Sequence, residues 1–186
     1  MLAGIVSCGG GGSGASFPDA PDLAKAQAQW CEALAKIEAG GATWEHMSKC
    51  KGATPTSSPS YLRGMTKCFT ARIDSAGDAA PDRGAISAEC NEEVVLKLSA
   101  DGALDSDVIA ARCERMKKCE KVETADCKTG VEKLETAQKV MLTTTYNPPA
   151  LAEIADCLRS KGCTDNEEIV RDACYEEQSK KLLWFP

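Results

Sequence analysis

Cysteine is the residue type that could do the most chemistry in this chain, since 11 of its 186 residues are cysteines. A thiolate can ligate a soft metal, attack an electrophile or exchange with a disulfide. No two cysteines form a Cys-x-x-Cys pair, however, so the patterns typical of thioredoxin-like redox sites and of common zinc sites are missing. The spacing therefore favours structural disulfides, which form and persist in oxidising compartments.

Cys8 differs from the other ten cysteines, because it ends a short apolar segment and opens a Gly/Ser-rich tract over residues 9–16. The run Ile5-Val6-Ser7-Cys8 resembles the lipobox of bacterial lipoproteins, in which a signal peptidase cuts before a cysteine whose thiol then carries lipid. The resemblance implies lipidation of Cys8, and the tract after it suits a flexible tether. Only seven residues precede Cys8 and none is basic, so we expect the leader to be truncated or its start mis-assigned.

The overall charge limits the partners that this chain can have. Its net charge is −6 and its sequence pI is near 5.0, which argues against a nucleic-acid binder, since such a protein needs a basic face to neutralise phosphates. After Cys8 no apolar run approaches the length of a membrane-spanning helix. We expect attachment to a membrane through the lipid on Cys8, an unknown protein or envelope polymer as partner, and no nucleic acid.

Apolar residues recur at helical spacing along most of the chain, and the alternation typical of strands is absent. A long sixth helix is predicted from Thr124 to Met141. Ser106 is predicted to cap the fifth helix, and Thr164 the eighth, whose apolar residues include Ile169. The sequence therefore predicts an all-α fold, a disulfide-stapled helical bundle.

The order helix, helix, Pro-containing loop, helix, helix occurs twice, which predicts two degenerate four-helix repeats. We expect a truncated signal, lipobox and tether over residues 1–20, a first repeat over 21–100 and a second over 101–186. Four cysteines of each half correspond: Cys31 with Cys113, Cys50 with Cys127, Cys68 with Cys157, and Cys90 with Cys174.

The second half has two cysteines without a counterpart, which predicts the disulfide Cys119–Cys163. If the helices run alternately down and up, the heights of the other cysteines give a nested arrangement. The full predicted set is Cys31–Cys90, Cys50–Cys68, Cys113–Cys174, Cys119–Cys163 and Cys127–Cys157. A rival scheme joins near neighbours, Cys119–Cys127 and Cys157–Cys163, because connectivity does not follow from sequence alone.

Few other residues suggest catalysis. His46 is the only histidine, and we interpret it as a partly exposed helix residue rather than a catalytic base. Paired acids such as Glu92-Glu93 fall on polar helix faces, and the stretch from Arg112 to Lys121 reads as an ordinary charged face. We therefore expect no enzyme activity and no cofactor or metal.

The hypothesis that follows is a non-enzymatic lipoprotein of the cell envelope, exported by a signal peptide and lipid-anchored outside the cytoplasm. It would lie in the periplasm or at the cell surface, with the outer membrane as the expected anchor, and serve as a binding or structural module. One alternative is a small-ligand carrier with a cavity between helices. A second is a cytosolic thiol or metal protein, in which reduced Cys113, Cys119 and Cys127 could gather as soft ligands.

Overall fold

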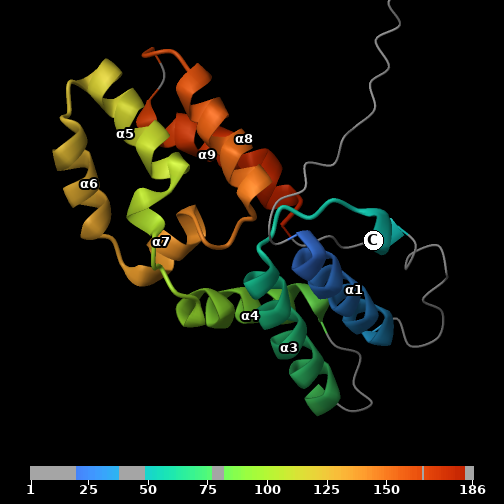
Figure 1. Ribbon diagram of the computed structural model, residues 1–186. Coiled ribbons are helices and arrows are strands. Elements are labelled where there is room, and N and C mark those ends of the chain that lie inside the picture. Colours follow the sequence, from blue (N-terminus) through green and yellow to red (C-terminus); the bar gives the residue numbers. More distant parts are fainter. Residues whose placement is uncertain (1–19, 38–48, 77–81, 165, 183–186) are drawn as a thin grey trace, which may run out of the picture.

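The computed structural model describes residues 20–37, 49–76, 82–164 and 166–182, and within them the regular secondary structure is helical apart from one antiparallel bridge between Ser57 and Tyr146 (Figure 1). The predicted all-α, disulfide-stapled fold is confirmed. The helices are α1 (Ala20–Ile37), α3 (Pro59–Ala76), α4 (Arg83–Lys97), η1 (Ala103–Asp105), α5 (Asp107–Glu120), α6 (Thr124–Glu132), α7 (Thr136–Leu142), α8 (Pro148–Ser160) and α9 (Glu167–Lys180).

Helix starts follow local capping chemistry. The side chains of Asp82, Ser106 and Asn147 accept hydrogen bonds from the first backbone N–H groups of α4, α5 and α8. The predicted cap at Thr164 is wrong, because Asn166 caps α9 instead. Ile169, predicted among the apolar residues of this helix, is 66% exposed, and the buried face of α9 comes from residues spaced by four: Val170, Cys174 and Gln178.

The single long sixth helix predicted from Thr124 to Met141 is also wrong. The chain leaves α6 at Lys133, and a capping box between Glu135 and Gln138 starts α7 as a separate helix. The break redirects α7, so that Met141 is 53% exposed.

Two helix packings dominate the fold: α1 lies on α3, and α5 lies on α8 (Figure 1). The first core cluster gathers large side chains from α1, α3 and α4, including Trp30, Phe69 and Val94, and α7 adds Val140 to it. Two further clusters lie among α5, α6, α8 and α9. The predicted division of the chain near residue 100 stays a prediction.

Ten cysteines form five disulfides, and one of these is Cys119–Cys163, the pair that the excess cysteines of the second half predict. The other four predicted pairs, Cys31–Cys90, Cys50–Cys68, Cys113–Cys174 and Cys127–Cys157, differ from those in the structure. The observed pairs are Cys31–Cys50, Cys68–Cys90, Cys113–Cys127 and Cys157–Cys174. Both rival pairs, Cys119–Cys127 and Cys157–Cys163, are absent among these bonds.

The four pairs were predicted wrongly because the height of a cysteine along its helix does not tell in which direction its side chain points. Cys113 and Cys127 lie on facing buried sides of α5 and α6, 5.6 Å apart at Cα. A disulfide needs Cα atoms within about 7 Å and converging side chains. The nested scheme would pair α5 with α9 and α6 with α8, whereas the disulfides join each helix to the segment that follows it in its own hairpin.

The observed bonds nevertheless follow the predicted correspondence between the halves. Cys31–Cys50 corresponds to Cys113–Cys127, and Cys68–Cys90 corresponds to Cys157–Cys174. A residue of α1, α3 or α4 and the residue at the same distance from the aligned cysteine in α5, α8 or α9 are called equivalent below.

The two halves meet through equivalent segments, those that precede α3 and α8. The backbone N–H of Ser58 donates to the carbonyl of Thr145 at 2.7 Å, and the N–H of Asn147 donates to the carbonyl of Thr56 at 2.8 Å. Ser58 and Asn147 are themselves equivalent, and each precedes a proline that begins a helix. The junction is therefore approximately symmetric in its backbone pairing.

Candidate functional site

The residues predicted to carry chemistry do not assemble a catalytic or metal site in the described part of the chain. Cys8 and His46 lie outside the described residues. The other cysteines are all bonded in disulfides, so Cys113, Cys119 and Cys127 present no thiolate in this oxidised state. Within the described ranges no group of three or more His, Cys, Asp or Glu side chains is arranged to hold a metal ion.

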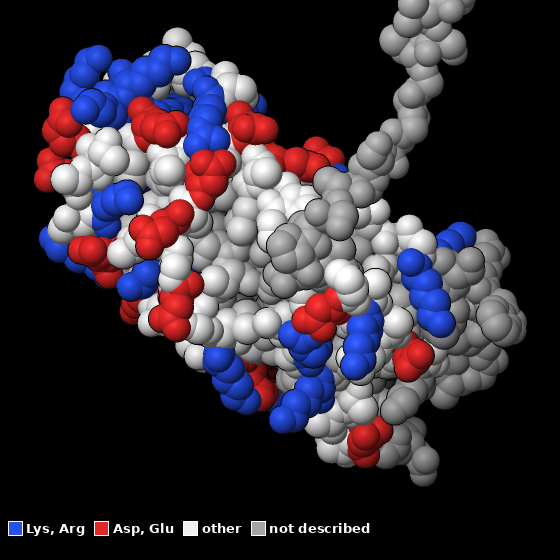
Figure 2. All heavy atoms as spheres, viewed as in Figure 1, with Lys and Arg blue, Asp and Glu red and all other residues white. Residues whose placement is uncertain are grey.

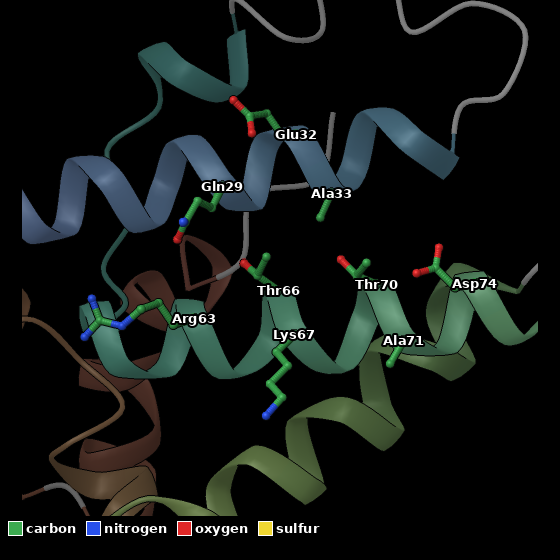
Figure 3. A pocket seen from close by; sticks show the side chains of 9 residues that line it. All are labelled: Gln29, Glu32, Ala33, Arg63, Thr66, Lys67, Thr70, Ala71 and Asp74. Atoms are coloured by element: carbon green, nitrogen blue, oxygen red, sulfur yellow. The ribbon is translucent and has the colours of Figure 1, made fainter.

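A groove of about 580 Å³ runs between α1 and α3, and we call it the α1–α3 groove (Figure 3). Side chains from both helices line it: Gln29, Glu32 and Ala33 from α1, and Arg63, Thr66, Lys67, Thr70, Ala71 and Asp74 from α3.

Large side chains hold the two helices together beside the groove and leave small ones along it. The rings of Trp30 and Phe69 pack edge to face with centroids 5.2 Å apart. Ala33 is buried next to this contact. The hydroxyl of Thr66 donates to the carbonyl of Leu62 at 2.8 Å, so its hydrogen is used within its own helix. The middle of the groove is consequently formed by small side chains such as Ala33, Thr66 and Thr70.

Charged side chains border the groove, with Arg63 at one end and Asp74 at the other (Figure 3). Arg63 donates to Asp22 at 2.6 Å, and this hydrogen bond holds the pKa of the Asp22 carboxyl below its usual value. Among the described residues no ion pair involves Glu32, Lys67 or Asp74. These three charges remain available to a partner lying in the groove.

The equivalent face between α5 and α8 carries large cationic side chains in place of small ones. Arg115 stands where α1 has Ala33, and Arg159 stands where α3 has Thr70. Arg159 reaches from α8 to α5, where its Nε lies 3.0 Å from the Glu114 carboxylate. A single guanidinium therefore spans the two helices on the face that is grooved in the first half.

Arg115 extends this bridging to α9. Its side chain is only 2% exposed, and it donates to Glu167 at 2.6 Å and to the Gly162 carbonyl at 3.0 Å. The disulfide Cys119–Cys163 adds a covalent link between the end of α5 and the same connection. The second half thus carries arginines where the first half has Ala33 and Thr70, and it has a fifth disulfide that the first half lacks.

Figure 2 shows Lys and Arg mixed with Asp and Glu over one face of the molecule, with basic side chains gathered around the end of α5. Many of these cations have acidic partners. Arg112 lies 3.1 Å from Glu167, and Lys117 lies 2.9 Å from Glu123. The contacts fit the predicted charged helix face better than a surface for an anionic partner.

The α1–α3 groove was missed in the sequence, because no residue type in it suggests chemistry. The sequence does contain a signal for the groove, which appears when the two halves are aligned by their cysteines. In that alignment two arginines of the second half correspond to Ala33 and Thr70. A groove between packed helices depends on side-chain volume at such positions, and alignment of the repeats exposes that difference.

Searches of family models, curated proteins and solved structures found no match to this chain. In the described residues none of the helices combines the length and apolar character needed to cross a bilayer.

Proposed function

We propose that this protein is a non-enzymatic binding module of the cell envelope, held to a membrane by lipid on Cys8, and that a protein partner docks in its α1–α3 groove. The observation that carries the proposal is the difference between two equivalent helix pairs. One keeps an open groove of about 580 Å³, while the other is spanned by Arg159.

The five disulfides indicate an oxidising environment outside the cytoplasm. Lipid anchoring is the finer part of this proposal and rests on the lipobox-like run that ends at Cys8. Two or more acyl chains on one cysteine would give stable anchoring, at about 0.8 kcal/mol per buried CH₂.

The chemistry of the groove suits an amphipathic helix of a partner protein. Such a helix packs its apolar face into a groove between two other helices, and its charged side chains pair with opposite charges at the edge of the groove. Small side chains such as Ala33 and Thr70 allow close approach, and the opposite charges of Lys67 and Asp74 set the direction of the incoming helix. A partner helix with an acidic residue near Lys67 and a basic residue near Asp74 would pair with both of these charges.

Site-specific photo-crosslinking tests the docking. A benzophenone amino acid is placed at Lys67 in the full chain, expressed in its own cell envelope, with a second probe at the half-buried Lys128 of α6 as control. We expect an adduct from position 67 and none from position 128.

The same experiment is repeated with Thr70→Arg, which installs the side chain found at the equivalent position of α8. We expect Arg at position 70 to approach Glu32 as Arg159 approaches Glu114, to fill the groove, and to abolish the adduct. Ala152→Arg on the exposed surface of α8 is the matched control. An adduct that persists with Thr70→Arg, or one formed equally from position 128, contradicts docking in the groove.

The anchor is tested separately by intact mass of the non-reduced protein from its membrane fraction after iodoacetamide treatment. We expect a chain that begins at Cys8, is heavier by its acyl groups, and carries no alkylated thiol. A chain that retains Met1 without added lipid mass refutes the anchor and leaves the docking proposal to the crosslinking result.

A further inference from the structure

A second hollow lies at the junction of the two halves, and its chemistry differs from that of the α1–α3 groove. It has a volume of about 520 Å³, and we call it the junction cleft. Its walls come from three places besides Leu23: residues 53–56 before α3, the first turns of α8, and the end of α9.

Hydrogen bonds between the halves hold these walls in place. The hydroxyl of Thr56 donates to the Gln178 carbonyl at 2.6 Å, and the amide of Asn147 donates to the Pro55 carbonyl at 2.8 Å. The backbone N–H of Thr56 also donates to the Lys181 carbonyl at 3.3 Å. Because these bonds join the segment before α3 to α8 and α9, the cleft has a defined shape.

Gln178 is the unusual residue of the cleft. It is 5% exposed, and its Nε2 donates to the Glu153 carboxylate at 2.6 Å, but its buried Oε1 has no hydrogen-bond partner. A buried acceptor left without a donor costs about 1–3 kcal/mol. No side chain or backbone N–H of the described residues donates to this oxygen.

The first half shows that this polarity is not required by the fold. The equivalent of Gln178 is Val94, and the equivalent of Glu153 is Gly64, which packs so closely on Val94 that an added Cβ would lie 2.7 Å from its Cγ1. The second half therefore replaces a tight apolar contact by a carboxylate and a buried amide, and both line the junction cleft.

The remaining polar groups of the cleft already have partners. Lys180 pairs with Glu176 at 2.5 Å and Lys181 with Glu177 at 2.6 Å, which offsets the two ammonium charges. Among the described residues Glu153 forms no ion pair within 4 Å, although the ammonium of Lys181 is near enough to interact with its charge. The cleft consequently offers the second carboxylate oxygen of Glu153, and Oε1 of Gln178, which is enclosed in its wall, has no donor.

We propose that the junction cleft binds a small primary amine in its ammonium form. The ammonium donates to Glu153 and to Oε1 of Gln178, which supplies the missing donor and a charge partner together. The apolar walls formed by Leu23, Pro55 and Ala150 accept a short aliphatic chain. The site is separate from the α1–α3 groove and does not depend on docking there.

Nuclear magnetic resonance of the ¹⁵N-labelled full chain tests this, with n-butylammonium chloride as probe and n-butanol as its neutral analogue. We expect saturable shifts of the Gln178 side-chain amide and of the Ala150 backbone amide with the amine, and none with the alcohol. Shifts that do not saturate, or equal shifts with butanol, overturn the proposal.

Variants locate the binding. Glu153→Gln keeps the shape of the side chain and removes its charge, and we expect it to weaken binding at least tenfold. Gln178→Val installs the residue of the first half, which removes the second acceptor, and we expect a similar loss. Glu168→Gln, an exposed carboxyl elsewhere on α9, leaves the affinity unchanged. Wild-type affinity in folded Glu153→Gln and Gln178→Val proteins refutes the site.

Discussion

The α1–α3 pair and the α5–α8 pair are built on corresponding cysteines, yet one leaves a groove and the other is bridged by the side chain of Arg159. The backbone arrangement is shared, since α1 packs on α3 as α5 packs on α8. The difference comes from side-chain volume and charge at two positions, Ala33 and Thr70 against Arg115 and Arg159. A repeated scaffold can thus keep its disulfide framework while one copy is stabilised and the other keeps a surface for binding.

The largest loss of stability is expected on removal of Cys119–Cys163, the disulfide that has no counterpart in the first half. Replacing both partners, Cys119→Ser with Cys163→Ser, releases a crosslink between residues 44 apart in the sequence. The chain-entropy relation gives a loss of about 4 kcal/mol in the free energy of unfolding. Urea denaturation followed by circular dichroism measures it.

The control for that experiment changes the neighbouring exposed residues instead, Lys118→Ser with Thr164→Ser. We expect this variant to lose less than about 0.5 kcal/mol in the free energy of unfolding. A loss below about 1 kcal/mol for the cysteine pair means that Arg115 and its partners already hold the connection between α8 and α9 without the disulfide.

Arg115→Ala gives α5 the residue found at the equivalent position of α1. We expect this variant to lose about 3 kcal/mol in the free energy of unfolding. The change leaves Glu167, whose side chain is 14% exposed, with one cationic partner fewer and the Gly162 carbonyl without its donor. Lys117→Ala removes an exposed pair with Glu123 and should cost less than about 1 kcal/mol. Equal losses for the two variants, measured by thermal unfolding, contradict the role assigned to Arg115.

At the equivalent residues Gly64 and Glu153 we expect a smaller difference in stability, and here the first half should lose more than the second. Gly64→Ala brings a Cβ to 2.7 Å from the Val94 Cγ1, and this overpacking should cost about 1–2 kcal/mol despite the better helix propensity of alanine. Glu153→Gln, which keeps an oxygen acceptor for the buried Gln178 amide, should cost less than about 1 kcal/mol in the free energy of unfolding. Similar stability changes for both, measured by urea denaturation, argue against the tight contact between α3 and α4.

The smallest effect of a single group on stability is expected at alkaline pH. Burial raises the pKa of Tyr146 at the junction to about 12, and it also raises the pKa of Tyr61 and Tyr175. Between pH of about 10 and 12 the unfolded chain releases protons that the folded chain keeps. Stability is therefore complete below pH 10 and falls as the pH rises, by about 1 kcal/mol at pH 11 for Tyr146 alone.

Absorbance at 295 nm against pH measures this titration directly, because these are the only three tyrosines of the chain. We expect the native protein to show no ionisation centred near pH 10, and the reduced protein in urea to show all three there. A native titration near pH 10 contradicts the burial of the tyrosines in both halves.

Part of this organisation follows from the sequence and part does not. Apolar spacing predicts α1, α3 and α5 because each buries one face along a single direction. The break before α7 was missed because apolar residues continue through it, and the capping box at Glu135 competes with that pattern. The α1–α3 groove could not be predicted from its own residues, since Ala33 and Thr70 are unremarkable until Arg159 is seen to join α8 to α5 and Arg115 to join α5 to α9.

The sequence by itself determined the helical class, the correspondence of the cysteines and the surplus pair Cys119 and Cys163. These depend on local periodicity and on counting, which need no coordinates. Only the tertiary structure decided that Cys113 bonds to Cys127, that α7 adds Val140 to the first core, and that a groove stays open between α1 and α3. Such outcomes depend on the direction in which side chains leave facing helices, and a linear pattern does not carry that information.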